Sequence, residues 1–470
     1  MKITVSANES NTKNILSLLE EMGISLPCNC HGKHHCNGTI YSFDCSFIPK
    51  EPTTITLPDL GEHIQGISLE HMPKSQGIGD TLLIDLGTTT IALALIRKDS
   101  GTLLQTHVFS NPQNSYGADI ISRIQSAMEG NGRTLTTLIQ NKIEEETKHL
   151  CKINNQSVTD IAQCFIGGNT AMIHLLMGYD CQPLSASPFT IKESSPKTFS
   201  YNSCEIHIMP WITAFIGGDI TAGMIACNME ENTSLLMDLG TNGELLLHHN
   251  GNWYATSTAA GPAFEGNGIS CGCAAISGAI CKVELKRLRP ILSTIDNKIP
   301  VGLCGSGALS LCSELINNGY VTKEGILTEC FHKGGIILGK TKDGKTLAFT
   351  PEDFRHMQPA IAAVAAGIET LCHESGLHSS DIEKVFLGGG FGFHLDFNTC
   401  QTLGMFSAIN KASIIPMGNT CLQGLYSCAV NNISPDNLPN VIHVELADNS
   451  FFKESFLRHM TYADEVISTT

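Results

Sequence analysis

The string Asp-Leu-Gly-Thr occurs twice in this chain, at residues 85–88 and 238–241, and each copy ends an apolar run. An apolar run of strand length that ends in Asp, Gly and small hydroxyl residues is typical of a β-hairpin tip that can approach a phosphate. Glycine lets backbone N–H groups come close, threonine adds hydroxyl donors, and aspartate can hold Mg²⁺ through water. Two copies predict a duplicated fold that binds one nucleotide from both sides.

The composition excludes several classes of protein. The chain has 470 residues, 42% of them hydrophobic, and a formal net charge of −16. These values predict a globular α/β protein of several domains and argue against nucleic acid as a partner. No run is long and apolar enough for a membrane span, and the start lacks a secretory signal pattern. Together with 19 cysteines, which favour a reducing and anaerobic setting, this predicts a cytoplasmic protein with no membrane partner.

A second repeat supports the duplication. Residues 159–169 and 380–390 each read Thr or Ser, Asp, Ile, three further residues, Phe, Ile or Leu, and then Gly-Gly. Each follows a helical pattern, at about residues 135–151 and 353–375. Between the two motifs the second half is longer by 68 residues, counted from Asp85 to Asp160 and from Asp238 to Asp381. We therefore expect an insertion at about residues 260–350.

These patterns predict four segments. Residues 1–50 form a small unit that begins with a strand at 1–5 and a helix at 11–22. Residues 51–80 are a linker with a strand near 54–57. Residues 81–234 form the first half. Residues 235–470 form the second half, which carries the insertion and returns to the first half near its C-terminus.

The ordered motifs of residues 81–430 resemble the ASKHA superfamily of acetate and sugar kinases, Hsc70 and actin. This resemblance implies two ribonuclease-H-like halves that close on ATP and Mg²⁺. Asp85 and Asp238 would be catalytic, anchoring hydrated Mg²⁺ and orienting the attacking water; the alternative for each is a turn residue that caps its own backbone. The nucleotide-binding residues would be Gly87, Thr88, Thr89, Gly240, Thr241, Asn242 and Gly243 for phosphate, and Gly388, Gly389, Gly390 and Gly392 for adenosine.

Residues 111–124 are expected to open a helix that links the halves. Asp119 is a candidate catalytic base that orients water, and Arg123 is a candidate phosphate partner. The alternatives are a helix cap for Asp119 and a surface position for Arg123.

Further characteristic strings lie at residues 165–172, 215–219, 260–266, 269–272 and 302–308. They resemble one ASKHA family, the reductive activators of corrinoid enzymes. This resemblance implies ATP-dependent return of cob(II)alamin to cob(I)alamin on the corrinoid protein of a methyltransferase system, with a low-potential electron donor and a homodimer. Such a reduction is uphill, and a gap of a few hundred millivolts needs roughly 5–7 kcal/mol. Two alternatives are an ASKHA small-molecule kinase and a nucleotide-gated module that binds a corrinoid protein without its own redox centre.

That family normally begins with a [2Fe–2S] ferredoxin domain whose ligands follow a Cys-x₅-Cys-x₂-Cys pattern with a later fourth cysteine. Cys30 and Cys36 keep the first spacing, but Thr39 stands where the third ligand is expected, and the segment is too short for the usual domain. The ferredoxin-like segment is therefore truncated. Three alternatives remain: an iron–sulfur cluster on four cysteines, a Zn²⁺ site that adds His31, His34 and His35, or no metal. The four candidate metal ligands are Cys28, Cys30, Cys36 and Cys45.

Cys271 and Cys273 form a second close pair of thiols. Two thiols alone cannot complete a metal site, so we expect these residues to be structural. The neighbouring Glu265 lies in a stretch where a loop could face a partner.

The N-terminal alternatives differ in one simple measurement, the iron and zinc content per chain after anaerobic purification. The cluster alternative predicts iron and a visible absorbance band that dithionite bleaches. Zinc without iron would contradict a cluster and support the zinc site. Absence of both metals would support the alternative in which the segment binds no metal.

Overall fold

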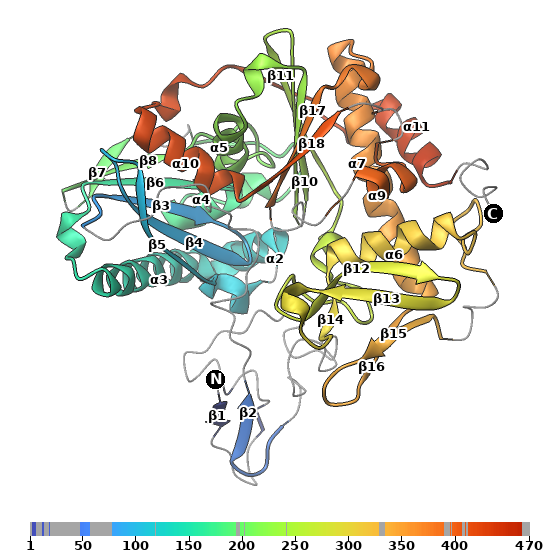
Figure 1. Ribbon diagram of the computed structural model, residues 1–470. Helices are drawn as coiled ribbons and strands as arrows, with labels where there is room; N and C mark the ends of the chain where they lie inside the picture. Colours follow the sequence, from blue (N-terminus) through green and yellow to red (C-terminus); the bar gives the residue numbers. More distant parts are fainter. Residues whose placement is uncertain are drawn as a thin grey trace. The chain divides into compact units, whose positions relative to one another are not determined.

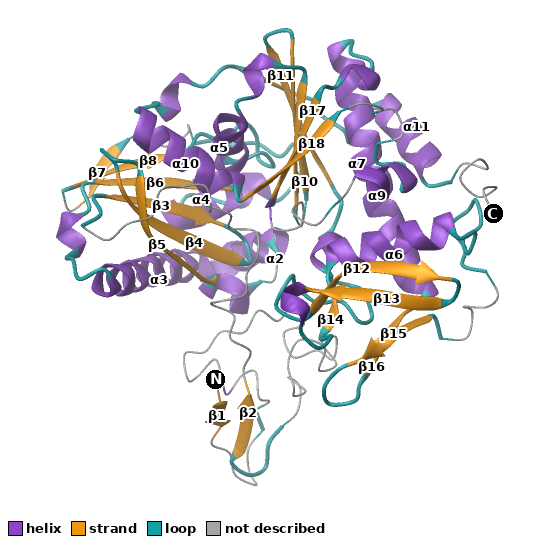
Figure 2. Cartoon of the chain, in the orientation of Figure 1, coloured by secondary structure: helices purple, strands orange, loops and turns teal. Residues whose placement is uncertain are grey.

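The computed structural model describes residues 2–5, 12–13, 18, 48–56, 78–117, 119–193, 198–201, 203–240, 242–328, 334–389, 395, 397–406, 409 and 412–462. These residues form two compact units. The first holds the described residues up to 228 together with residues 419–439, and the second holds residues 229–418 and 440–462. Each combines a mixed sheet with helices, as Figure 2 shows, which confirms the predicted α/β class.

The first unit is built on a six-stranded sheet of order β5-β4-β3-β6-β8-β7. Strands β3 and β4 form the predicted antiparallel hairpin, and β6 pairs in parallel with β3. Figure 1 labels these strands and the helices of the unit. Their bounds are β3 Thr81–Leu86, β4 Thr90–Arg97, β5 Thr102–Ser110, β6 Gln163–Gly168, β7 Phe199–Tyr201, β8 Cys204–Ile208, α2 Ile120–Ser126, α3 Gly132–Ile153, α4 Thr170–Met177, α5 Gly218–Cys227 and α10 Thr420–Asn431.

The second unit is built on a six-stranded sheet of order β18-β17-β9-β10-β11-β19. Strands β9 and β10 form the second predicted hairpin, and β17 pairs in parallel with β9. If β19 and β7 are set aside, the order around each hairpin is the same in both sheets. The bounds are β9 Ser234–Leu239, β10 Gly243–His249, β11 Asn252–Thr258, β17 Lys384–Gly388, β18 Ser413–Gly418, β19 Val441–His443, α7 Pro351–Ser375, α9 Phe397–Thr402 and α11 Ser450–His459.

The two sheets also share their register. Asp85 of β3 lies opposite Gly167 of β6, and Asp238 of β9 lies opposite Gly388 of β17. In both, the aspartate therefore faces the first glycine of the Gly-Gly pair that ends the neighbouring parallel strand. A shift of one residue would move each aspartate to the other face of its sheet. The shared register is strong support for the duplication that the repeats predict.

The stretch between β11 and α7 forms a subdomain of its own. It contains a three-stranded sheet of order β13-β12-β14, a two-stranded antiparallel sheet and one helix. The elements are β12 Ala279–Lys286, β13 Arg289–Thr294, β14 Gly302–Leu303, α6 Gly305–Asn317, β15 Ile336–Lys340 and β16 Thr346–Phe349.

Near the N-terminus, β1 Lys2–Val5 pairs antiparallel with β2 Thr53–Thr56. Both strands are predicted from the sequence, but the pairing is not, and it ties residues 53–56 to the first strand. Most of the helix expected at residues 11–22 lies outside the described residues.

Local sequence explains where the long helices begin and end. Thr350 caps α7 in a capping box with Asp353, Pro351 occupies its first turn, and Gly376 adopts φ +68° just beyond its end. Helix α3 turns Leu135, Ile139 and Leu150 into the core of the first unit, at helical spacing. Both helices lie where the sequence predicts them.

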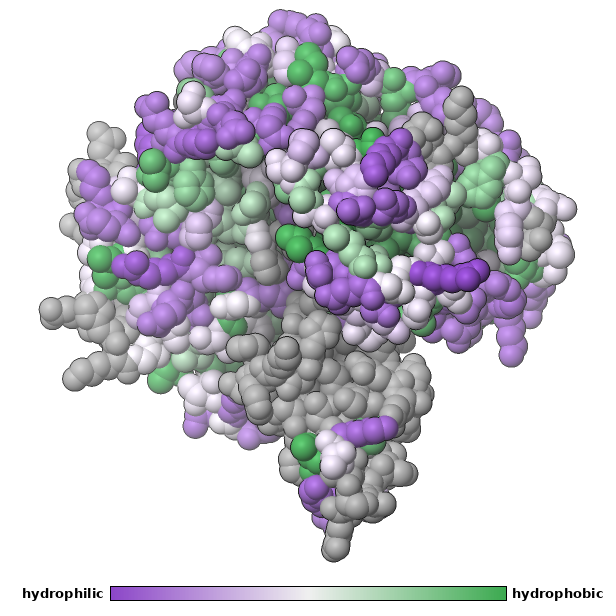
Figure 3. Space-filling view, turned by 180° about the vertical axis from the view of Figure 1, so that it is seen from behind, coloured by the Kyte–Doolittle hydropathy of each residue, from purple (hydrophilic) through white to green (hydrophobic). Residues whose placement is uncertain are grey.

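The helices of the first unit cover both faces of its sheet. Leu82 and Ile84 of β3 share a core with α3 and α4. Because side chains alternate along a strand, Asp85 faces the other side, where α5 and α10 pack against β3 and β6. The face drawn in Figure 3 has hydrophobic residues in small groups between hydrophilic ones. In the part of the chain that the structure describes, no helix is both long and apolar enough to cross a membrane.

A glycine in α10 lets this helix pack closely against α5. A Cβ on Gly424 would lie 1.9 Å from the backbone oxygen of Ala222, which leaves no room for any side chain. The hydroxyl of Tyr426, two residues on, donates to the backbone oxygen of Gly101 at 2.6 Å. These contacts hold α10 in a defined place beside β3.

We expect Gly424→Ala to lower the free energy of unfolding by roughly 1–3 kcal/mol, because the methyl group must push α10 away from backbone atoms. Gly132→Ala is the matched control. It has helical φ and ψ, and a Cβ there would make only ordinary van der Waals contacts, 3.5 Å or more from Ala127, so alanine should stabilise α3 by up to about 1 kcal/mol. Thermal and urea unfolding measure both changes, and equal stability of the two variants would contradict this packing.

Candidate functional site

The first predicted phosphate turn joins β3 to β4. Asp85 is the penultimate residue of β3, and Gly87, Thr88 and Thr89 form the turn. A Cβ on Gly87 would lie 2.4 Å from the backbone oxygen of Thr90, so the turn requires glycine there. The structure thus places the predicted carboxylate, glycine and hydroxyl residues at one hairpin tip.

The carbonyl groups of this turn are bonded to the segment that follows β5. The side-chain amide of Asn111 donates to the oxygen of Gly87 at 2.9 Å, and its backbone N–H donates to the oxygen of Thr89 at 2.9 Å. The side-chain amide of Asn114 donates to the same Thr89 oxygen at 3.4 Å. With the carbonyl oxygens of Gly87 and Thr89 bonded to protein donors, the turn at residues 87–89 can present N–H and O–H groups to an anion.

Arg123 supports this segment from within the core. Its side chain is fully buried, and its guanidinium donates to the oxygen of Gly117 at 2.8 Å, to Asn114 Oδ1 and to the sulfur of Met172. Burial lowers the pKa of Arg123 to about 10. Both sequence interpretations of Arg123 are therefore wrong here, because the residue is neither on the surface nor available to a phosphate. Because Arg123 donates to Asn114 Oδ1, the amide nitrogen of Asn114 is the end that faces the turn.

Asp119 is the N-cap of α2. Its Oδ1 accepts a hydrogen bond from the backbone N–H of Ser122 at 2.8 Å, and the Ser122 hydroxyl lies 3.2 Å from the Asp119 nitrogen. This is the capping alternative given above, and α2 lies within the first unit. A role as the base that orients water stays a prediction.

The carboxylate of Asp85 is held by residues that the sequence analysis missed. Asn419 donates its side-chain N–H to Asp85 Oδ2 at 2.6 Å, and the thiol of Cys421 also hydrogen-bonds to this carboxylate. Burial raises the pKa of Asp85, and these two hydrogen bonds oppose the rise. A Cβ on Gly167 would lie 2.4 Å from Cys421 Sγ, which explains why glycine stands opposite Asp85.

The second turn joins β9 to β10. Asp238 is the penultimate residue of β9, the N–H of Gly240 donates to the oxygen of Asn242 at 2.9 Å, and Thr258 Oγ1 donates to the oxygen of Gly243 at 3.1 Å. A Cβ on Gly240 would lie 3.8 Å from Glu265 Oε1, so Glu265 lies beside this turn. The predicted ligand Thr241 lies outside the described residues.

The Gly-Gly pair after β17 approaches the second carboxylate. Gly389 adopts φ +72°, and a Cβ there would lie 2.8 Å from Asp238 Oδ1. Gly388 is the register partner of Asp238. Gly390 and Gly392 lie outside the described residues, so their predicted contact with adenosine stays a prediction. In the first unit the described donor set is a carboxylate with hydroxyls and backbone amides, which suits hydrated Mg²⁺ and phosphate, and in the second unit the described residues place the carboxylate of Asp238 beside glycines.

The thiols that the structure describes do not form a metal site. Cys271 and Cys273 are buried; burial raises the pKa of Cys271 to about 12, and it raises the pKa of Cys273 as well. No group of three or more His, Cys, Asp or Glu residues within the described ranges could hold a metal ion. The four predicted iron–sulfur ligands, Cys28, Cys30, Cys36 and Cys45, lie outside those ranges.

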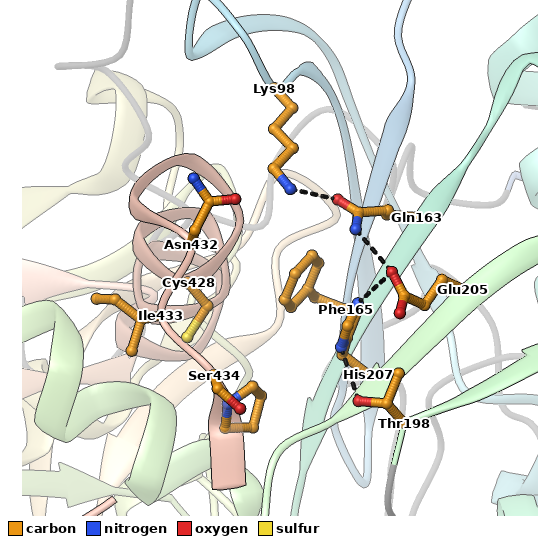
Figure 4. A pocket seen from close by; sticks show the side chains of 11 residues that line it. Lys98, Gln163, Phe165, Thr198, Glu205, His207, Cys428, Asn432, Ile433 and Ser434 are labelled. Atoms are coloured by element: carbon orange, nitrogen blue, oxygen red, sulfur yellow. Dashed lines mark hydrogen bonds and ion pairs between the residues drawn. The ribbon is translucent and has the colours of Figure 1, made fainter. Parts of the chain in front are cut away.

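A cavity of about 280 Å³ lies in the first unit beside Gln163 at the start of β6 (Figure 4). This is the opposite end of the strands from Asp85. Lys98 donates to Gln163 at 2.7 Å, and Gln163 donates to Glu205 at 2.9 Å. His207 lies 3.3 Å from the same Glu205 oxygen and 2.9 Å from the hydroxyl of Thr198. The dashed lines in Figure 4 mark these contacts between the lining side chains. The polar residues of the lining are therefore accounted for by their contacts with one another.

Comparison with known proteins identifies two matching family models. The model described as the C-terminal domain of RACo, the ASKHA domain, matches residues 232–469. The model described as the RACo middle region matches residues 81–232. Together they cover both units.

Individual proteins agree with these matches. A corrinoid activation enzyme, RamQ, of Eubacterium limosum is 29% identical over 423 residues, covering 82% of this chain and 71% of that protein. A [Co(II) methylated amine-specific corrinoid protein] reductase of Methanosarcina barkeri is 28% identical over 291 residues, so the match spans 56% of this chain and about half, 52%, of that relative. A solved reductive activator for corrinoid, iron–sulfur protein superposes with a TM-score of 0.69 at 27% identity, covering 83% of this chain and 67% of the other.

The raised pKa of Asp85 predicts a stability cost at neutral pH. A carboxyl whose pKa is higher in the folded state favours folding when protonated, and this contribution is lost as the pH rises through the folded pKa. We therefore expect Asp85→Asn to raise the free energy of unfolding at pH 7 by roughly 0.5–2 kcal/mol, with the gain shrinking as the pH falls. The exposed Asp99→Asn should change stability by less than about 0.5 kcal/mol. A destabilised Asp85→Asn protein at pH 7 would contradict the burial argument.

Proposed function

The chain belongs to the RACo family, and on that premise we propose that it reductively activates a corrinoid protein in an ATP-dependent reaction. One electron from a low-potential donor would convert cob(II)alamin, the substrate, to cob(I)alamin on that protein. The observation that carries this proposal is the continuous match of the two RACo models across residues 81–469. The names of the relatives, which specify corrinoid activation and corrinoid protein reductase, point the same way.

For the nucleotide we propose that both hairpin turns bind phosphate oxygens of ATP. In the first unit the donors are the backbone amides of residues 87–89 and the hydroxyls of Thr88 and Thr89. In the second they are the amides and side chains of residues 240–243. Asp85 and Asp238 would hold hydrated Mg²⁺, which when bound neutralises phosphate charge.

We further propose that the chain hydrolyses this ATP. In that step Asp85 or Asp238 would orient the attacking water, a role that requires an ionised carboxylate in a fixed position. The hydrogen bonds of Asn419 and Cys421 to Asp85 support this assignment, because they stabilise the ionised form against burial. Hydrolysis of ATP to ADP and phosphate would supply the energy for the uphill electron transfer.

Four finer expectations complete the proposal. The partner would be the corrinoid protein of a methyltransferase system, the electron would come from a low-potential donor, the protein would act in the cytoplasm, and it would form a homodimer. If the N-terminal cysteines bind an iron–sulfur cluster, that cluster would receive the electron from the donor. The cytoplasmic location comes from the composition and patterning of the sequence and the other points from the family resemblance, and all of them stay predictions.

We expect Asp238→Ala to reduce ATP-dependent cob(I)alamin formation at least roughly 100-fold, because a ligand for the phosphate-bound cation is lost at a preorganised site. Asp448→Ala is the matched control, since this aspartate is fully exposed in the same unit. Cobalt reduction is followed by absorbance with a cob(II)alamin protein as substrate under anaerobic conditions.

Full activity of Asp238→Ala would refute the site assignment. Stimulation of ATP hydrolysis by sugars or carboxylates, and not by the corrinoid protein, would refute the proposed function in favour of a small-molecule kinase.

A further inference from the structure

Two strand-to-helix junctions carry the same three residues, Gly-Asn-Thr, at 168–170 and 418–420. Both asparagines belong to the first unit. The first string leads from β6 into α4, and the second leads into α10. In each, the asparagine is the N-cap of the helix. Asn169 Oδ1 accepts from the N–H of Met172 at 3.0 Å, and Asn419 Oδ1 accepts from the N–H of Leu422 at 2.7 Å.

The cap determines where the other end of each amide lies. A side-chain amide has one acceptor oxygen and one donor nitrogen, so an oxygen bound to the helix leaves the N–H₂ group facing away from it. Asn169 Nδ2 donates to Thr88 Oγ1 at 3.0 Å, and Asn419 Nδ2 donates to Asp85 Oδ2 at 2.6 Å. Both donors therefore reach the first phosphate hairpin.

We propose that Asn169 and Asn419 are paired positioning residues that aim the Thr88 hydroxyl and the Asp85 carboxylate at the bound nucleotide. This inference rests on the proposed function, in which residues 85–89 bind the phosphates and the hydrated Mg²⁺ of ATP. A Thr88 oxygen that accepts from Asn169 has its own proton to donate to a phosphate oxygen. The two oxygens of a carboxylate have about four acceptor sites, so an Asp85 carboxylate that accepts from Asn419 and Cys421 can still bind hydrated Mg²⁺.

The surrounding packing keeps both caps in place. The Thr170 hydroxyl, next to Asn169, donates to the oxygen of Thr213 at 2.6 Å. Farther along α4, Thr136 of α3 donates to the oxygen of Leu175 at 2.7 Å. Helix α10 is seated by the contact of Gly424 with Ala222 described above. The amide donors are thus held by helices whose positions do not depend on the nucleotide.

The alternative is that these asparagines only cap their helices, and serine separates the two roles. A serine hydroxyl caps a helix about as well as an asparagine oxygen, but it is too short and lacks the amide donors that reach the hairpin. Asn449→Ser is the matched control, because Asn449 caps α11 in the same way and donates to the exposed Glu374. All three serine variants should keep the thermal stability of the parent chain within a few degrees.

The experiment measures the affinity for a Mg²⁺-bound non-hydrolysable ATP analogue by calorimetry, together with kcat and KM of ATP turnover, on the full chain. Asn169→Ser should weaken binding of the analogue and raise KM by about 10-fold, with kcat kept within about twofold. Asn419→Ser should lower kcat by about 10- to 100-fold and change KM much less. Asn449→Ser should match the parent in both measurements.

Asn419→Asp keeps the cap and removes the amide donor, so it serves if the serine variant does not fold.

Asp85→Asn separates failure of this inference from failure of the proposed function. If Asp85→Asn leaves ATP turnover unchanged, the hairpin is not the nucleotide site, and the proposed function fails at its centre. If Asp85→Asn abolishes turnover while Asn169→Ser and Asn419→Ser match Asn449→Ser, the two asparagines are caps only, and the positioning role is overturned.

Discussion

In each unit, parallel strand pairing sets an aspartate opposite a glycine. The rest of the structure depends on this constraint. Asp85 lies opposite Gly167 and Asp238 opposite Gly388, so each carboxylate stands beside a residue without a side chain. At Gly167 the space is taken by Cys421, and at Gly389 it is taken by the carboxylate of Asp238 itself. A larger residue at either position would displace the group that the proposed chemistry requires.

Burying a carboxylate at the end of a strand is costly, and the first unit offsets part of this cost with hydrogen bonds from distant segments. Asn419 is 334 residues from Asp85 in the sequence, yet it donates to this carboxylate. Hydrogen bonds from a distant segment also support the turn, since Arg123 orients Asn114 and Asn114 donates to the oxygen of Thr89. The site therefore depends on the packing of α10 and the segment at 111–123 as much as on the hairpin itself.

Local patterns in the sequence were sufficient for the framework. Apolar runs ending in Asp and Gly predicted both hairpins, and helical spacing predicted α3 and α7. The partners of the site could not be read in this way, because each is defined by a long-range contact. Arg123 looked like a surface or phosphate-binding residue, since nothing in its neighbourhood in sequence reveals a buried guanidinium. The repeated Gly-Asn-Thr was visible as a signal, but only the structure shows where the free end of each amide lies.

The central claim is that the hairpin at residues 85–89 binds the phosphates of ATP. A crystal structure of the chain with Mg²⁺ and a non-hydrolysable ATP analogue tests it most directly. Phosphate oxygens should lie within hydrogen-bonding distance of the amides of residues 87–89, and hydrated Mg²⁺ should lie beside Asp85, with the Asn419 hydrogen bond kept. A nucleotide bound elsewhere, for example in the cavity beside Lys98 and His207, with the hairpin unoccupied, would contradict it.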